Sequence, residues 1–293
     1  MMLILSLLVL AVCSSEAHAA EAELRVAVAQ PLTVPGDVEG NIERMAPLIK
    51  EASERGAGLI VFSECAITGY DLKGVGAKAA LSLDSREVGK MSKLAKKQRI
   101  TIIAGLHEKQ DGRLYNSACI FFPDGNRVVQ RKHNVMDSEK QICPVLPGER
   151  KRTLFNVNGF TCAVLICADT GIPGIFDELA GEKCDAIISI TAGAGDEKFG
   201  MRQSELGNPE KLKKYLDTAL TCIGQDMIAT SLRLRIAQVA CNQSGWKPET
   251  GYFHPGGSIV VDHTGETSVV IPPRFVLEHV KADMAIGTIH KKP

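Results

Sequence analysis

Short apolar runs alternate with amphipathic stretches along the first third of the chain, a pattern that predicts strands and helices in succession. Residues 24–30 and 59–63 are apolar runs and predict buried strands. Between them, residues 41–55 predict a helix with Asn41 as its N-cap and glycines just beyond its end. Residues 85–99 predict a second helix with a basic, solvated face. Each predicted helix therefore follows or precedes a buried strand.

The middle of the chain changes to hairpins. Residues 114–122 and 127–132 flank a Pro-Asp-Gly-Asn turn and predict a hairpin that ends on Lys132. A second hairpin is predicted around the Asn-Gly pair at 158–159, and its later strand runs directly into Cys167. Glycine and proline follow, so we expect Cys167 at a corner between strand and turn.

The remainder repeats the alternation of strand and helix. The predicted elements are a strand at residues 185–190, helices at 209–222 and 226–235, and strands at 238–242, 257–261 and 268–272. We interpret residues 20–293 as one α/β domain, a layered mixed sheet with helices outside, because no linker-like segment interrupts them.

Composition narrows the class of ligand. The chain has 293 residues, of which 45% are hydrophobic and 23% charged, as expected for a globular protein with a large core. The 34 basic residues equal the 34 acidic ones, so the charge does not indicate nucleic acid or an anionic membrane surface as a partner. A small neutral or weakly charged molecule fits this balance better.

The N-terminal segment predicts export. Residues 1–13 form an apolar run. Ala17-His18-Ala19 follows it and has the small-x-small pattern of a signal-peptidase site. The run is shorter than the ~20 apolar residues that a membrane span needs, so we expect cleavage near Ala19 and a periplasmic or secreted protein. A lipid anchor on Cys13 is the less favoured alternative, because Val12 is large for the position before a lipidated cysteine.

The cysteine pattern argues against a disulfide framework and a zinc site. Of the nine cysteines, four lie in or beside apolar runs, where a free cysteine behaves as a small buried hydrophobe: Cys119, Cys162, Cys184 and Cys241. The sequence contains no C-x-x-C pair of the kind that structural zinc sites use.

Three polar residues follow three separate buried strands: Glu64, Lys132 and Cys167. A thiol with its usual pKa of about 8.5 is a poor nucleophile until it is ionised. A carboxylate can take its proton, and an ammonium can stabilise the thiolate and an oxyanion. Taken singly, each residue also has an ordinary interpretation: a core cysteine, a capping glutamate and a solvated edge-strand lysine.

The segments around these residues decide between the two interpretations. RVAVAQ, GAGLIVFSECAITGYD, VVQRKHNV, VLICADTGIP, VACNQSG and PGGSIVVDHTGE follow one another along the chain. Together they resemble the nitrilase, or carbon-nitrogen hydrolase, superfamily over nearly all of residues 20–293. The resemblance implies a nitrilase-like four-layer αββα sandwich.

The same resemblance implies a Glu–Lys–Cys mechanism without metal or organic cofactor. Glu64 would act as general base and then acid, Cys167 as nucleophile, and Lys132 would stabilise the tetrahedral intermediate. The backbone N–H of Ala168 would be a second donor to the oxyanion. Many relatives carry a second glutamate between the lysine and the cysteine; Glu139 is our candidate for it.

Several points stay open at this stage. Glu149 competes with Glu139 for the place of the second glutamate. Ala168 stands where relatives carry a bulky residue and Gly174 where they carry an acidic one, so the substrate cannot be taken from relatives. The resemblance further implies a homodimer or larger homo-oligomer.

For the function, we expect hydrolysis of a non-peptide amide, ureide or N-carbamoyl bond through a thioester, with release of ammonia or an amine. Asp169 favours these substrates over nitriles, because true nitrilases typically carry Trp-Glu after the cysteine. A nitrilase proper is one alternative. A catalytically silent relative that binds a ligand or partner is the other.

Overall fold

The structure is a computed structural model that describes residues 22–71, 74–142, 146–149, 152–193, 202–205, 208–220, 226–247, 252–273 and 283–292. The predicted export signal and Cys13 lie outside these ranges, and export therefore stays a prediction. In the part described, no helix is both long and apolar enough to cross a membrane.

Strands and helices alternate in the first third of the chain and hairpins occupy the middle, as the pattern predicts, whereas strands alone follow Leu234 in the described part of the C-terminal region. The strands are β1 (Glu23–Gln30), β2 (Leu59–Val61), β3 (Thr101–Gln110), β4 (Arg113–Phe121), β5 (Arg127–Arg131), β6 (Phe155–Val157), β7 (Phe160–Ile166), β8 (Ala186–Thr191), β9 (Ala237–Asn242), β10 (Ser244–Lys247), β11 (Tyr252–Val261), β12 (Thr267–Pro273) and β13 (Asp283–His290). The helices are α1 (Val38–Glu54), α2 (Val75–Lys78), α3 (Arg86–Gln98), α4 (Asp137–Ile142), α5 (Ile175–Gly181), α6 (Pro209–Leu220) and α7 (Asp226–Leu234), with 3₁₀ turns at Cys167–Gly171 and Gln203–Glu205.

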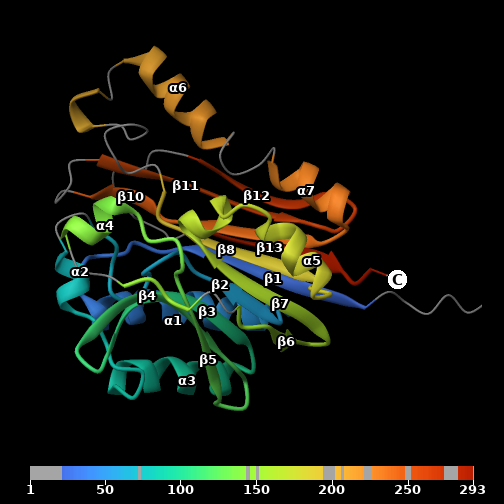
Figure 1. Ribbon diagram of the computed structural model, residues 1–293, viewed down its shortest axis with the longest axis horizontal. Coiled ribbons are helices and arrows are strands. Elements are labelled where there is room, and N and C mark those ends of the chain that lie inside the picture. The colour runs from blue at the N-terminus through green and yellow to red at the C-terminus, as the bar shows by residue number, and fades with distance from the viewer. Residues whose placement is uncertain are drawn as a thin grey trace, which may run out of the picture.

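Two sheets stack face to face between helices (Figure 1). The first has six strands in the order β13-β1-β2-β3-β4-β5, and the second has seven in the order β10-β11-β9-β8-β7-β6, with β12 paired to β11. Helices α1 and α3 bury apolar side chains on the first sheet, while α5 and α7 cover the second. The predicted four-layer αββα sandwich is confirmed.

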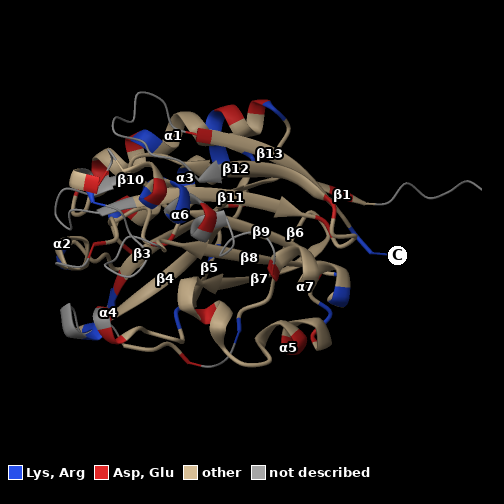
Figure 2. Ribbon diagram, turned by 90° about the horizontal axis from the view of Figure 1, so that it is seen from above, with Lys and Arg blue, Asp and Glu red and all other residues tan. Residues whose placement is uncertain are grey.

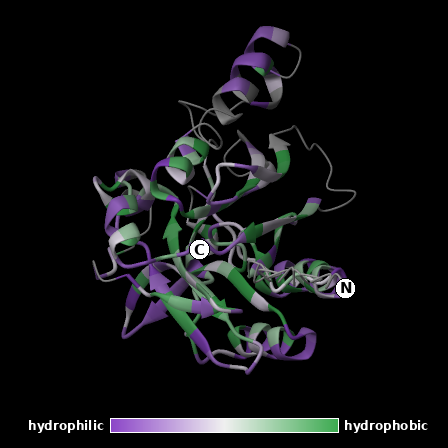
Figure 3. Ribbon diagram, turned by 90° about the vertical axis from the view of Figure 1, so that its right-hand side faces the viewer, coloured by the Kyte–Doolittle hydropathy of each residue, from purple (hydrophilic) through white to green (hydrophobic). Residues whose placement is uncertain are grey.

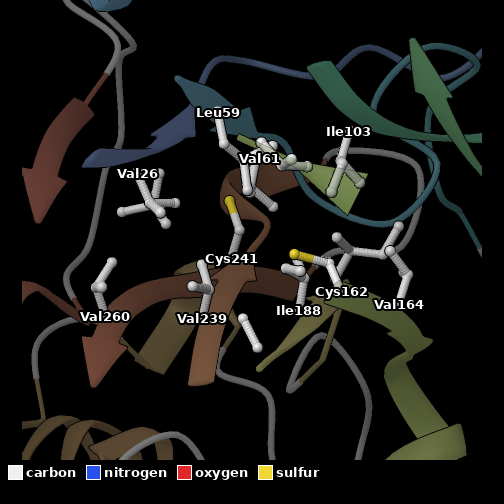
Figure 4. Packing of buried hydrophobic residues seen from close by; sticks show 14 of the residues in the cluster. Val26, Leu59, Val61, Ile103, Cys162, Val164, Ile188, Val239, Cys241 and Val260 are labelled. Carbon is white, nitrogen blue, oxygen red and sulfur yellow. The ribbon is translucent and has the colours of Figure 1, made fainter. Parts of the chain in front are cut away.

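The core between the sheets comes from strand alternation. Side chains at every second position point to the same face, so Val26, Leu59 and Ile103 of the first sheet meet Val164 and Val239 of the second (Figure 4). Two cysteines lie in this same core, and all those the structure describes are free thiols: Cys65, Cys119, Cys162, Cys167, Cys184 and Cys241. The prediction of buried, unpaired cysteines in apolar runs is confirmed for Cys119, Cys162, Cys184 and Cys241.

Strand direction brings the chemically interesting ends to one edge. Strands β1, β2 and β3 are parallel to one another, and so are β7, β8 and β9. Because β4 is antiparallel to both β3 and β5, β5 runs in the same direction as β3. The carboxyl ends of β2 and β5 therefore lie at the same edge of the first sheet.

Local details differ from the sequence prediction: α2, α4, α5 and β10 were not predicted, and two further differences concern α1 and β13. Helix α1 begins earlier than predicted, because the side chain of Asp37 accepts the Gly40 N–H and caps it. Asn41 is instead buried in the helix, where its amide donates to the carbonyl oxygens of Val34 and Ile67. Strand β13, which the sequence analysis did not predict, pairs along the full length of β1.

Charged residues are concentrated in the outer layers and absent from the central strands of the second sheet. Acidic and basic residues colour the helices and loops, whereas β7, β8 and β9 are uncharged along their lengths (Figure 2). Helix α6 is the exception to the layering, since it lies outside the four layers, at the top of Figures 1 and 3.

Candidate active site

Glu64, Lys132 and Glu139 form a buried cluster at the shared strand edge. Glu64 follows β2, Lys132 follows β5, and Glu139 lies on α4. The Lys132 ammonium donates to Glu64 Oε1 at 2.8 Å and to both Glu139 oxygens at 2.9 Å. These three acceptors match the three N–H bonds of an ammonium. Lys132 is only 1% exposed, so its positive charge acts almost entirely within the protein.

Two further groups hold Glu64. The side-chain amide of Asn116 on β4 donates to Glu64 Oε1 at 2.7 Å and to Glu139 Oε1 at 3.1 Å. The backbone N–H of Ala192, which follows β8 in the second sheet, donates to Glu64 Oε2 at 2.9 Å. Sequence reasoning missed both. The Asn116 side chain, a polar group within a predicted strand, was a signal that the sequence offers, whereas a backbone amide gives no signal in the sequence.

The orientation of the Asn116 amide is itself fixed by a buried chain of hydrogen bonds. Its oxygen accepts from the Cys65 thiol at 3.5 Å, and the Cys65 sulfur lies 3.7 Å from Nε2 of His107. Nδ1 of His107 is 2.9 Å from the Thr68 hydroxyl. Burial lowers the pKa of His107 to about 4, so this imidazole is neutral at physiological pH.

Cys167 stands at the predicted corner, directly after β7 and at the start of a 3₁₀ turn. Its φ of 48° lies in the left-handed region, which costs a residue with a side chain about 1–3 kcal/mol and recurs at functional sites. The thiol interacts electrostatically with Glu64, Lys132 and Glu139. Cys167 also lines a cavity of about 570 Å³.

The protonation states follow from burial and charge. Burial raises the pKa of Cys167 to about 12, Glu64 acts in the same direction, and Lys132 opposes both. Burial also raises the pKa of Glu64 above its usual 4.5, against the lowering effect of Lys132. Burial disfavours the Lys132 ammonium, but Glu64, Cys167 and Glu139 outweigh it, and its pKa lies well above the usual value. At neutral pH the resting cysteine is therefore a thiol beside a buried ion cluster.

Asp169 joins the two strand ends that carry Cys167 and Lys132. Its carboxylate accepts the backbone N–H groups of Ile166, His133 and Asn134, at 3.2, 3.0 and 2.7 Å. Arg152 lies 3.5 Å away as a buried counter-ion. Of the three residues that donate to Asp169, Ile166 immediately precedes Cys167, and His133 and Asn134 immediately follow Lys132. The carboxylate thus fixes the separation of the thiol and the ammonium.

A close approach beneath Glu64 requires a glycine. A β-carbon at Gly105 would lie 2.2 Å from the Cys65 nitrogen and 2.8 Å from the Glu64 α-carbon. Gly105 therefore allows the backbone at Glu64 and Cys65 to lie directly against β3.

Tyr70 is also part of the site. Burial and the charges of Glu64 and Glu139 raise the pKa of its phenol well above the usual value.

The structure brings together most of the residues singled out in the sequence. Of the two glutamates proposed as the additional acid, Glu139 contacts Lys132, whereas Glu149 is exposed. Ala168 lies on the cavity wall beside Cys167. Among the residues that the structure describes, no group of three His, Cys, Asp or Glu side chains could hold a metal ion.

Comparison with known proteins agrees with this arrangement. The family model described as carbon-nitrogen hydrolase matches residues 25–291. The chain belongs to this family, within the nitrilase superfamily. It is 23% identical over 254 residues to a glutamine-dependent NAD(+) synthetase of Acinetobacter baylyi, covering 85% of this chain and 42% of that protein. An aliphatic nitrilase of Sinorhizobium fredii is 33% identical over 129 residues, 38% of this chain and 42% of that protein. The chain thus matches less than half the length of these curated relatives.

Solved structures support the fold. An amidase of Nesterenkonia from the nitrilase superfamily superposes with a TM-score of 0.70 at 19% identity, covering 90% of both chains. Another structure of the Nesterenkonia amidase, 20% identical over 91% of this chain and 90% of that one, carries the acetamide moiety of fluoroacetamide on its active-site cysteine, also with a TM-score of 0.70. At this identity the likeness concerns the fold.

Proposed function

We propose that the chain hydrolyses a non-peptide carbon–nitrogen bond of the amide, ureide or N-carbamoyl type through a thioester on Cys167. The observation that carries the proposal is the buried Glu64–Lys132–Glu139 cluster beside a thiol that lines a cavity. A resting thiol with a pKa of about 12 needs a base within the site, and Glu64 is the carboxylate with the larger electrostatic effect on it.

The steps follow from these positions. Glu64 takes the thiol proton as the Cys167 sulfur attacks the carbonyl carbon, and the carbonyl oxygen becomes an oxyanion. Glu64 then returns the proton to the leaving nitrogen, which departs as ammonia or an amine. Water, deprotonated by Glu64, attacks the thioester and releases a carboxylic acid and the thiol.

Lys132 and Ala168 are the proposed stabilisers of the oxyanion. All three N–H bonds of Lys132 are engaged by carboxylates at rest. A direct bond from Lys132 to the oxyanion therefore requires one N–H to leave Glu139. The Ala168 N–H, next to the nucleophile, is the second proposed donor.

Ammonia release from panels of amides, N-carbamoyl compounds and nitriles tests the proposal. We expect turnover of amide-type compounds, loss of turnover in Cys167→Ala, and an acyl adduct on Cys167 in the intact-mass spectrum. Turnover confined to nitriles would instead assign the nitrilase activity of the relative from Sinorhizobium fredii. Full activity in Cys167→Ala would contradict the mechanism.

Two proposals concern the protein as a whole. Export predicts that the N-terminus of the mature protein lies near Ala20, which N-terminal sequencing of secreted or periplasmic protein checks.

A homodimer is the proposed assembly. A molar mass of one chain, measured by light scattering, would contradict it.

A further inference from the structure

The cavity at Cys167 extends along the outer face of the second sheet. Ile188, Val239 and Cys241 point into the core between the sheets (Figure 4), and Ile190 belongs to the same buried cluster. Their neighbours along β8 and β9 therefore face the opposite way. Five of these outward residues line the cavity: Ser189, Thr191, Gln238, Ala240 and Asn242.

Strand register gives the length of this cavity. Thr191 pairs with Asn242 at the end near Cys167, and Ser189 pairs with Ala240 two residues further along. Gln238 lies four residues from Asn242 on β9, which corresponds to about 13 Å at roughly 3.3 Å per residue. The cavity therefore continues well beyond the reacting carbon, with Ser189 about halfway along it.

The walls carry both apolar and polar side chains along their length. Phe176 of α5 and Met227 of α7 contribute to the lining, together with Ala240. The side-chain nitrogen of Gln238 is committed to the Met227 carbonyl at 2.8 Å and the Ser231 hydroxyl at 3.1 Å. Within the described part of the chain, no residue donates to the Gln238 oxygen or bonds to the Ser189 hydroxyl. Gln238 is 1% exposed and Ser189 6%, and both line the cavity, so a group bound there can donate to these two oxygens.

The geometry of the reaction decides which part of the substrate enters. The leaving nitrogen must face Glu64 to receive a proton, and neither Glu64 nor Lys132 is among the described residues that line the cavity. The group that extends away from Glu64 along the sheet is therefore the acyl group.

We infer that the substrate carries an elongated, largely apolar acyl chain with a hydrogen-bond donor such as a hydroxyl toward its far end. This inference rests on the proposed hydrolase activity and specifies its substrate class. Phe176, Met227 and Ala240 contact the chain, and Ser189 or Gln238 accepts from its hydroxyl, according to how far along the cavity the hydroxyl lies.

Straight-chain primary amides of increasing length, each with its terminally hydroxylated counterpart, are the probes. We expect kcat/KM to rise about fourfold for each methylene that is buried, until the chain fills the cavity. The longer hydroxylated amides should exceed their unsubstituted counterparts. A kcat/KM that is independent of chain length, or that is highest for acetamide, would overturn the inference.

Variants in the wall locate the effect. Ser189→Leu fills the cavity halfway, so the ratio of kcat/KM for long over short amides should fall more than tenfold. Ser189→Ala should reduce the preference for the hydroxylated amides. The control is Ala229→Leu, on the exposed side of α7, which should behave as the unchanged protein does.

The outcomes separate the two proposals. If amides are hydrolysed but Ser189→Leu and Ala229→Leu give the same ratio, only the elongated acyl group is refuted. If no amide is hydrolysed and Cys167 forms no acyl adduct, the proposed function fails and this inference fails with it.

Discussion

Replacing Asn116 by alanine removes the uncharged side chain that, like Lys132, donates to both Glu64 and Glu139. The two bonds, at 2.7 and 3.1 Å, go to buried carboxylates. A hydrogen bond to a charged group contributes about 1.5–3 kcal/mol, and both carboxylates keep Lys132 as a partner, so we expect stability to fall by about 3 kcal/mol.

The kinetic effect should be specific to the base. The Asn116 bond lowers the pKa of Glu64, so its removal raises that pKa further. Glu64 accepts the thiol proton only as a carboxylate, and activity is lost as pH falls through its pKa. The acid limb of the kcat/KM profile should therefore move to higher pH, with a fall of about 100-fold at neutral pH from the misplaced base.

Ser117→Ala is the matched control. Ser117 is the next residue on β4, and its hydroxyl donates to the buried carboxylate of Glu108 at 2.6 Å. This variant should lose comparable stability while its acid limb stays in place. The reasoning is refuted if folded Asn116→Ala keeps the acid limb of the original protein and a kcat/KM within threefold of it.

Three further predictions follow from the surroundings of the site. His107 has a folded pKa of about 4 against 6.5 unfolded, so the unfolded state binds more protons between these values; stability should fall by about 2 kcal/mol from pH 7 to pH 5, measured by urea unfolding. His107→Gln should lessen this dependence. Gly105→Ala should displace the Glu64 backbone, lowering the unfolding midpoint and cutting kcat/KM more than tenfold. Asp169→Asn removes the charge of a buried ion pair and weakens a carboxylate that accepts three backbone N–H groups, so we expect about 3 kcal/mol of destabilisation. The rate at which iodoacetamide alkylates Cys167 should also change.

Each of these has a decisive contrary result. An unchanged pH dependence of unfolding in His107→Gln would show that another group titrates. Gly89→Ala is the control for Gly105, because a β-carbon there meets nothing within 4 Å; equal effects of the two substitutions would contradict the close approach. Normal stability in Asp169→Asn would mean that the carboxylate does not join the two strand ends.

Local signals in the sequence predicted much of the fold. The Asn-Gly pair at 158–159 has φ values of 50° and 89°, the left-handed pair that a tight hairpin requires. The strand ends that place Glu64, Lys132 and Cys167 were also predictable, because Glu64 and Cys167 follow apolar runs and Lys132 ends the hairpin around the Pro-Asp-Gly-Asn turn. The N-cap of α1 was not, since Asp37 and Asn41 have similar capping propensity and only the buried contacts of Asn41 distinguish them.

The remaining parts of the site depend on three-dimensional contacts. Choosing Glu139 over Glu149 required knowing which carboxylate α4 directs at Lys132. The structural role of Asp169, whose identity in the sequence had been used to infer a substrate class, appears only when the β5 and β7 ends are adjacent. Long-range geometry of this kind leaves no local pattern.

The bond from the Ala192 amide to Glu64 joins residues 128 positions apart, one beyond a strand of each sheet. Neither sheet contains a complete reaction centre, so the proposed base and nucleophile meet only after the two halves dock. Contacts of such sequence separation form at a high entropic cost. During folding Glu64 and Cys167 therefore lie apart until the sandwich closes, so the proposed reaction depends on completed tertiary structure.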